Sequence, residues 1–326
     1  MANQALGLKL QSLPRQLLYV LLVVFATVPL FFKSEIPNEP EPSTMSAYAS
    51  LLAIPDGSTV LIESDWTLST RGESAGQFES LMRILKAKKV KFALYSVDPL
   101  GPQIAKNTIE RLNQERKSKN LPLIEKWNDW VELGVFPNLE GQTTSMGINL
   151  RAAFKGKSDS NPATNKAEDV FKSPVLEKVN TIADVAGIII VTASSSLDTN
   201  VERLSDKTKI TAMVTGVMGP EAKPYLAAGQ LQGLSIGLKG VYDLEYMMNY
   251  GLRGPGIDDP ERKDKRPVYA KLGDGTLPPL TEIEPGATTF DRGAKYYLAL
   301  HSALFLMIAM IVLGNVGMFM SKGRRR

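Results

Sequence analysis

The chain has 326 residues, of which 44% are hydrophobic and 22% are charged, proportions typical of a folded protein rather than a disordered chain or a polytopic transporter. It contains no cysteine and one histidine, His301, which excludes disulfide scaffolds, zinc–thiolate sites, iron–sulfur clusters and histidine-based metal clusters. The net charge of +4 comes from the ends: seven of the 38 basic residues lie in 1–33 and 322–326, which hold no acid. The other 31 stand against 34 acidic residues, so we expect no nucleic-acid partner.

The first predicted element is an apolar segment near the N-terminus. Residues 17–32 carry no charge, and Leu13 and Pro14 extend the run toward the roughly 17–25 residues that a spanning helix needs. The run ends in bulky side chains followed by Lys33, without the small residues of a signal-peptide cleavage site. We therefore predict a transmembrane helix over 13–33, an uncleaved signal anchor that follows a cytoplasmic segment, 1–12.

Residues 34–57 begin with a stretch rich in Pro and Glu, EIPNEPEP, and continue with a short apolar helix expected over 45–54. They precede the regular pattern of apolar runs that starts at Ser58. We assign them as a spacer between the membrane and the domain that follows.

In residues 58–250, short β-branched runs alternate with amphipathic helices. Strands are expected at 59–62, 91–97, 130–136, 187–191, 210–215 and 231–236. Helices are expected at 77–89, 101–119, 143–155, 166–183, 197–205 and 220–229, with a polar loop over 156–165. Continuous apolar strands that alternate with helices are typical of a parallel sheet covered on both faces. We predict an α/β domain with a Rossmann-like, doubly wound, mostly parallel sheet of about six strands, placed between two terminal transmembrane helices.

The C-terminal part contains a tether and a second apolar run. Residues 251–295 are rich in Pro, Gly and charges, so we expect an extended tether that packs in part on the domain or on a partner. Residues 296–320 carry no formal charge and are long enough for a transmembrane helix. Within this helix, small residues and one amide predict a contact with the first span or with another subunit. The contact residues are Gly314, Asn315 and Gly317.

The flanks of the two apolar runs predict one topology. Lys9 and Arg15 precede the first run and acidic residues follow it, while the second run ends in the basic tail 321–326. By the positive-inside rule, both termini are cytoplasmic and residues 34–295 are extracytoplasmic. The exposed part has no Asn-x-Ser/Thr sequon, which fits a bacterial inner membrane with the domain in the periplasm.

Polar residues gather where the predicted strands end, which is where open α/β sheets bind ligands. The candidate ligand-binding residues are Ser64, Asp65, Asp98, Ser194, Ser195, Thr215 and Gly216. Hydroxyls, carboxylates and glycines on one edge suit a polar solute or a cation, and Asp65 with Asp98 would make a carboxylate pair for Mg²⁺ or Ca²⁺. Ser and Asp are also ordinary N-caps of the helices that leave strand ends, and we favour this interpretation.

Several familiar catalytic and nucleotide-binding motifs are absent from the sequence. It has no GxGxxG after the first strand, no GxxxxGK[ST] loop and no Ser-x-x-Lys. We therefore predict no cofactor and no metal ion and assign no catalytic residue, although a Ser–Lys pair assembled from distant parts of the chain stays open.

Three functions are compatible with these patterns. The first is a non-enzymatic scaffold or accessory subunit of a membrane protein complex, with the lipid bilayer and other membrane subunits as partners and a second copy of the chain as an alternative partner. The second is a solute-binding domain that serves a transporter or a sensor. The third is a membrane-tethered envelope enzyme that uses Asp65 and Asp98 as acid, base or metal ligands.

Overall fold

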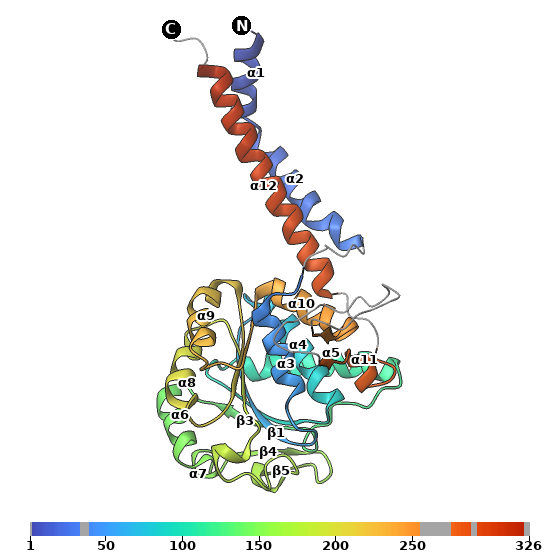
Figure 1. Ribbon diagram of the computed structural model, residues 1–326, viewed down its shortest axis with the longest axis vertical. Helices are drawn as coiled ribbons and strands as arrows, with labels where there is room; N and C mark the ends of the chain where they lie inside the picture. The colour runs from blue at the N-terminus through green and yellow to red at the C-terminus, as the bar shows by residue number, and fades with distance from the viewer. Residues whose placement is uncertain (1, 33–38, 255–274, 288–291, 323–326) are drawn as a thin grey trace. The chain divides into compact units, whose positions relative to one another are not determined.

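The computed structural model describes residues 2–32, 39–254, 275–287 and 292–322. The chain forms two compact units: one contains both ends, Met1–Asn38 with Asp291–Arg326, and the other is the domain Glu39–Phe290. Figure 1 labels the helices and some of the strands of the two units.

The domain is built on a six-stranded sheet with the order β3-β2-β1-β6-β7-β8, in which every pairing is parallel. Every residue of the three central strands β1, β6 and β7 is buried, because helices cover both faces of the sheet. The predicted α/β fold with six parallel strands is thereby confirmed. The strands are β1 (Thr59–Asp65), β2 (Lys91–Ser96), β3 (Trp130–Val135), β6 (Ile188–Thr192), β7 (Ile210–Val214) and β8 (Gly233–Ile236).

The helices divide between two apolar cores, one on each face of the sheet. Alternate residues of β1 point to opposite faces, so Ile62 joins the first core and Leu61 joins the second. The first core includes α4 (Arg71–Ala87), α5 (Gly101–Ser118) and α10 (Gly237–Tyr250). The second includes α6 (Leu139–Ile148), α7 (Leu150–Ala153), α8 (Ser196–Leu204) and α9 (Gly219–Ala227). This arrangement is Rossmann-like and doubly wound.

Residues 156–183 differ from the predicted polar loop and helix. They form a hairpin of β4 (Ser158–Asn161) and β5 (Lys166–Asp169), followed by the 3-10 turns η2 (Val170–Lys172) and η3 (Ile182–Asp184). Pro174 interrupts the segment, because proline lacks an amide hydrogen and clashes with the preceding turn of a helix. The apolar residues that suggested a helix are nonetheless buried in the second core: Val170, Phe171, Val175, Leu176 and Val179.

The segment assigned as a spacer, residues 34–57, contributes α3 (Pro42–Leu52) to the domain. Tyr48 and Leu51 are fully buried, and α3 packs against β8. A β-carbon at Gly233 of β8 would overlap the backbone of Ala47, so the glycine permits this close approach of helix and strand.

Part of the predicted tether also packs on the domain. Leu252 and Leu280 are buried in the first core, and the carboxylate of Glu284 forms an ion pair with Arg116 of α5. The remaining residues of the tether, 255–274 and 288–291, lie outside the described residues. The elements of this segment are β9 (Leu252–Arg253), β10 (Thr276–Leu277), which pairs antiparallel with β9, and α11 (Leu280–Ile283).

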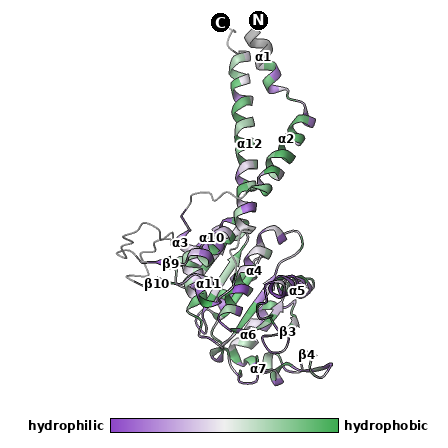
Figure 2. Cartoon of the chain, turned by 90° about the vertical axis from the view of Figure 1, so that its right-hand side faces the viewer, coloured by the Kyte–Doolittle hydropathy of each residue, from purple (hydrophilic) through white to green (hydrophobic). Residues whose placement is uncertain are grey.

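The other unit consists of helices from the two ends of the chain: α1 (Ala2–Gln11), α2 (Arg15–Thr27) with the 3-10 turn η1 (Val28–Phe31), and α12 (Arg292–Lys322). Figure 2 shows that α2 and α12 are largely apolar. Within α12, Gly293–Ser321 is long and apolar enough to cross a membrane. Arg15–Phe31 is apolar but shorter, at 17 residues, which rise about 25 Å against a hydrocarbon core of about 30 Å. Among the described residues, therefore, only the C-terminal one of the two predicted spans reaches a spanning length.

α1 packs against the C-terminal part of α12 through two glycines. A β-carbon on Gly7 would lie 2.8 Å from the carbonyl oxygen of Gly317, and a β-carbon on Gly317 would lie equally close to that of Gly7. The predicted contact residue Gly317 thus meets α1, which belongs to the predicted cytoplasmic segment and not to the first predicted span, whereas Gly314 has open space around it and Asn315 is exposed.

Candidate functional site

The strand order reverses between β1 and β6, which places the candidate site at this pair of strands. Their last paired residues are Asp65 and Thr192. The chain leaves β1 toward α4 on the first face and leaves β6 toward α8 on the second face. In open α/β sheets such a reversal leaves a crevice at the carboxyl ends of the strands, where ligands bind. We call the carboxyl ends of β1 and β6, together with the loops and first helical turns that follow β1, β2, β6 and β7, the carboxyl rim: residues 63–73, 97–103, 192–198 and 215–221.

Asp65 is held by hydroxyl groups from the neighbouring strand and its loop. The Thr192 Oγ1 hydroxyl lies 3.3 Å from Asp65 Oδ2, and the Ser194 hydroxyl donates to the same oxygen. Thr192 Oγ1 also accepts a hydrogen bond from the amide of Ser194 at 3.0 Å. Asp65 is 7% exposed, so its carboxylate is almost completely enclosed by these groups. The structure therefore brings two predicted site residues, Asp65 and Ser194, together.

A second carboxyl group, Glu63, lies two residues earlier on the same face of β1 and is fully buried. Asn200 of α8 donates to Glu63 Oε2 at 2.7 Å, and the Tyr95 hydroxyl lies 3.4 Å from Asn200 Oδ1. Glu63 Oε1 has no hydrogen-bond partner among the described residues. Burial raises the pKa of Glu63 to about 7, and the Asp65 carboxylate adds to this rise, whereas the hydrogen bond from Asn200 and the nearby hydroxyls of Ser196 and Tyr95 oppose it.

Glu63 stands beside Ser64 and Asp65 at the end of the first predicted strand, but it was not among the candidate ligand-binding residues. The available signal was a charged residue inside an otherwise apolar strand, TVLIESD, because a carboxyl group in such a strand is costly to bury without a cation. No ion pair to Glu63 occurs in the described part of the chain.

Ser96, the last residue of β2, joins the end of β1 to the loop that follows β2 through the hydrogen bonds of its hydroxyl. The Ser96 hydroxyl donates to the carbonyl oxygen of Ser64 at 2.7 Å and accepts from the amide of Asp98 at 3.1 Å. Asp98 Oδ1 accepts from the amide of Leu100 at 2.7 Å, at the start of α5. The hydrogen bonds of the Asp98 side chain thus stay within its own loop, whereas those of Asp65 lead to the loop after β6.

The three remaining candidates occupy other parts of the rim. Ser195 is exposed at the N-cap position of α8, where its side chain makes no capping hydrogen bond. Thr215 is buried at the end of β7, and the amide of Gly216 donates to Glu73 Oε2 of α4 at 2.6 Å. This bond ties the loop after β7 to α4.

Large apolar side chains are exposed around these engaged polar groups. Leu68 is 64% exposed, Leu100 56% and Val217 85%, and they belong to the loops after β1, β2 and β7. Apart from the buried Glu63 and Asp65, the charged side chains of the rim are Arg71, Glu73, Asp98, Asp198 and Glu221, four acids against one base. The rim therefore combines exposed apolar residues with an excess of negative charge.

The chemistry available for a cofactor or metal at the rim is limited. Within the described residues there is no group of three or more His, Asp or Glu side chains that would hold a metal ion. Two carboxyl groups, Glu63 and Asp65, and the surrounding hydroxyl and amide groups form the polar cluster at the strand reversal.

Comparisons of this chain with protein families, with curated proteins and with solved structures give no match.

Proposed function

We propose that this protein is a non-enzymatic accessory subunit of a membrane protein complex, and that its α/β domain docks on a partner through the carboxyl rim. The observation that carries the proposal is the state of the rim. The carboxylates of Asp65, Asp98 and Glu73 accept hydrogen bonds from within the chain, while three large apolar side chains stand exposed around them. A ligand site needs polar groups that are free to bind, whereas a docking surface needs exposed apolar area.

The charge of the rim indicates the chemistry of the partner. Four acidic side chains against one basic side chain favour a partner segment that carries Lys or Arg beside apolar residues. We propose that this segment belongs to another subunit of the membrane complex. Apolar residues of the segment would cover Leu68, Leu100 and Val217, and its cations would lie near Asp98, Glu73 and Asp198.

The proposal includes two membrane spans, with both termini in the cytoplasm and the domain in the periplasm. Leu13 and Pro14 precede the apolar helix at Arg15–Phe31 and would add apolar chain outside the helix, and the basic flanks favour cytoplasmic ends. The contact of α1 with the C-terminal part of α12 supports a common side for the two termini.

Single cysteines test this topology, because the chain has none of its own. In intact cells, cysteine at the exposed Ser158 should react with a membrane-impermeant maleimide, and cysteine at Ser321 should react only after lysis. Reaction of Ser321→Cys in intact cells would contradict the proposed orientation.

Site-specific photo-cross-linking tests the docking surface. A photoreactive amino acid replaces Val217, Leu68 or Leu100 in the full-length chain, expressed at its native level. The control is Ile148, which is 77% exposed but lies at the far end of α6 from the rim. We expect the three rim positions to cross-link to the same membrane protein, at a segment that carries both basic and apolar residues.

Two results would overturn the docking proposal. One is equal cross-linking from Ile148, which would mark the adducts as unspecific. The other is a product that contains only copies of this chain, or no product at all, from the three rim positions.

A second candidate function, a solute-binding domain, is favoured by one observation: the unpartnered, fully buried Glu63 Oε1 at the strand reversal. A small solute with a hydroxyl or amine donor would satisfy this oxygen. Binding would raise the melting temperature of the full-length protein by ligand linkage, and Glu63→Gln should remove the shift. This function would be excluded if a screen of polar metabolites shifted the melting temperatures of the wild type and of Glu63→Gln equally, or shifted neither.

A further inference from the structure

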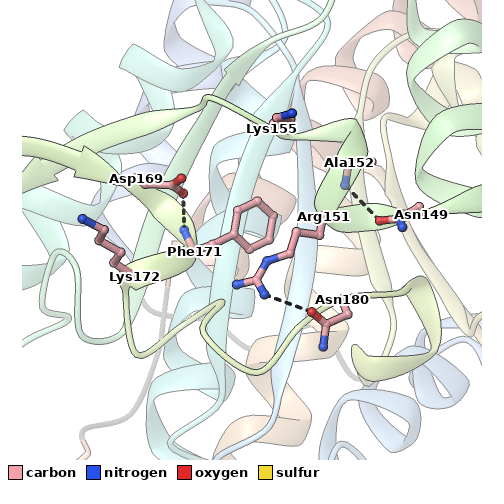
Figure 3. Close-up of a pocket in the computed structure, with 8 residues that line it drawn as sticks. All are labelled: Asn149, Arg151, Ala152, Lys155, Asp169, Phe171, Lys172 and Asn180. Atoms are coloured by element: carbon pink, nitrogen blue, oxygen red, sulfur yellow. Dashed lines mark hydrogen bonds between the residues drawn. The ribbon is translucent and has the colours of Figure 1, made fainter.

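A cavity of about 550 Å³ lies beside the β4–β5 hairpin, apart from the carboxyl rim. The segment that lines it leads into the amino end of β6, and Pro174 within that segment accepts a hydrogen bond from Lys91 at the start of β2, so the cavity belongs to the amino side of the sheet. Its volume is within the range of small-molecule sites. The lining residues are Asn149, Arg151, Ala152, Lys155, Asp169, Phe171, Lys172 and Asn180 (Figure 3).

The cavity carries an excess of positive charge. Three of its side chains, Arg151, Lys155 and Lys172, are cationic and only Asp169 is anionic. None of the three cations forms an ion pair with a carboxylate among the described residues. Asp169 Oδ1 is occupied by the amide of Phe171 at 2.9 Å. Nothing in the described part of the chain therefore neutralises these cations by direct contact.

Arg151 is positioned before any ligand arrives. Its backbone amide donates to the carbonyl oxygen of Asn180 at 3.0 Å, and its Nη1 donates to Asn180 Oδ1, also at 3.0 Å. The guanidinium lies over the Phe171 ring, 4.7 Å from the centroid, and Figure 3 shows it between that ring and Asn180. A guanidinium has five N–H donors in a fixed plane, so the bond to Asn180 leaves donors for a ligand.

We propose that this cavity binds a phosphate monoester. The net charge of the lining side chains matches a phosphate dianion, and a planar guanidinium with two ammonium groups is the donor set that proteins use for phosphate. The volume leaves space for the organic part of the molecule. Two sources share this chemistry: a soluble phosphorylated metabolite and the headgroup of a lipid such as phosphatidic acid.

Titration of the full-length protein in a non-ionic detergent tests the site, with glycerol 3-phosphate as the probe and chloride at matched ionic strength as the reference. We expect saturable binding by calorimetry and a loss of affinity of at least about tenfold in Arg151→Gln. The matched control, Lys117→Gln, removes one exposed, unpaired charge from α5 and should change the affinity by less than about twofold.

Two results would overturn the site: no saturable binding to the wild type, or equal affinities in Arg151→Gln and Lys117→Gln. A circular dichroism melt shows whether Arg151→Gln folds. If it does not, the double variant Lys155→Gln/Lys172→Gln replaces it, and we again expect a loss of affinity of at least about tenfold. An affinity equal to that of Lys117→Gln would again contradict the site. Arg151→Lys separates geometry from charge, because it keeps the charge and removes the planar fork. It should lie between the wild type and Arg151→Gln.

Reconstitution in lipid nanodiscs then distinguishes the two sources of phosphate. Discs of phosphatidylcholine alone should preserve binding of glycerol 3-phosphate. If phosphatidic acid in the disc abolishes this binding in the wild type, the lipid headgroup occupies the cavity, and if binding persists, the site serves soluble ligands. Either result supports a phosphate site, whereas binding that is absent from both discs contradicts it.

Discussion

The carboxyl rim and the cavity beside α7 are both lined by charged and polar side chains, and they differ in whether these groups have partners within the chain. At the rim, Asp65 accepts hydrogen bonds from Thr192 and Ser194, and Asp98 accepts one from its own loop. In the cavity, by contrast, three cationic side chains have no carboxylate partner among the described residues.

This difference shows why residue type and position in the fold are insufficient to locate a ligand site. The rim lies where α/β sheets usually bind ligands, yet most of its polar groups are already used to join strands to loops. The cavity lies at the amino side of the sheet, and its cationic donor groups have no carboxylate partner among the described residues. Mutation of a polar group that is hydrogen-bonded within the chain should lower stability. Mutation of a polar group without such a partner should instead lower ligand affinity.

The largest loss of stability should follow from breaking a buried ion pair. Arg116 is 2% exposed and forms two hydrogen bonds with Glu284, whose side chain is 12% exposed. Arg116→Met leaves the Glu284 carboxylate buried without its partner and should lower the free energy of unfolding by about 3–5 kcal/mol. The three tryptophans of the chain, Trp66, Trp127 and Trp130, all lie in the domain, so their fluorescence during urea denaturation measures this change.

A matched exposed pair provides the control for this prediction. Arg203 and Glu140 also form an ion pair, but their side chains are 46% and 66% exposed. Arg203→Met should cost no more than about 1 kcal/mol, because water screens exposed pairs. Equal losses in the two variants would show that Glu284 is not paired with Arg116 of α5 as described.

Glu63 is an exception at the rim, because it is buried and one of its oxygens has no partner. Its pKa is about 7 in the folded protein and about 4.5 when it is not perturbed. Between these pH values the folded state holds a proton that the unfolded state has lost, so the stability of the wild type should decrease as pH rises from about 4.5 to about 7. The full decrease is about 3 kcal/mol, since one pKa unit corresponds to about 1.4 kcal/mol.

Glu63→Gln should remove this pH dependence, because an amide does not ionise. The variant should equal the wild type below about pH 4.5 and exceed its stability above about pH 7. Urea denaturation at several pH values, with the exposed Glu110→Gln as control, measures the difference. A Glu63→Gln protein that is less stable than the wild type at pH 8 would mean that the ionised carboxylate has a partner there.

Alanine substitutions at two neighbouring serines of the rim should differ in their cost to stability, by a smaller amount than the changes above. The Ser194 hydroxyl donates to the Asp65 carboxylate, whereas the exposed Ser195 makes no capping hydrogen bond through its side chain. Ser194→Ala should cost about 1–2 kcal/mol, since it removes a hydrogen bond to a charged group, and Ser195→Ala should cost less than about 0.5 kcal/mol. Similar melting temperatures for the two variants would indicate that Asp65 does not depend on this bond.

The sequence predicts the regular part of the fold well, because its signal is local. The run Ile188–Val191 marks a buried strand by composition alone, and the same holds for β1, β2 and β7. The prediction was wrong over 166–183, where apolar residues at helical spacing cover the second core without forming a helix. Their burial depends on the neighbouring sheet, which periodicity does not report.

The candidate site was predictable only in part for the same reason. The position of Asp65 and Ser194 at strand ends follows from the order of strands and helices, and the structure joins them. The pairing of Arg116 with Glu284 spans 168 residues, and the approach of Arg151 to Asn180 depends on an irregular loop. Neither contact has a signature in local sequence.

The most direct test of the docking proposal is the size of the native complex formed by a rim variant. Leu68→Ser/Leu100→Ser/Val217→Ser replaces only exposed side chains, so the domain should stay folded, and Ile148→Ser is the matched control. After extraction in a mild detergent, the wild type and Ile148→Ser should migrate as a complex larger than the single chain, and the rim variant should migrate as the single chain. A wild-type protein that is already a single chain, or a rim variant that keeps the full size of the complex, would contradict docking through the carboxyl rim.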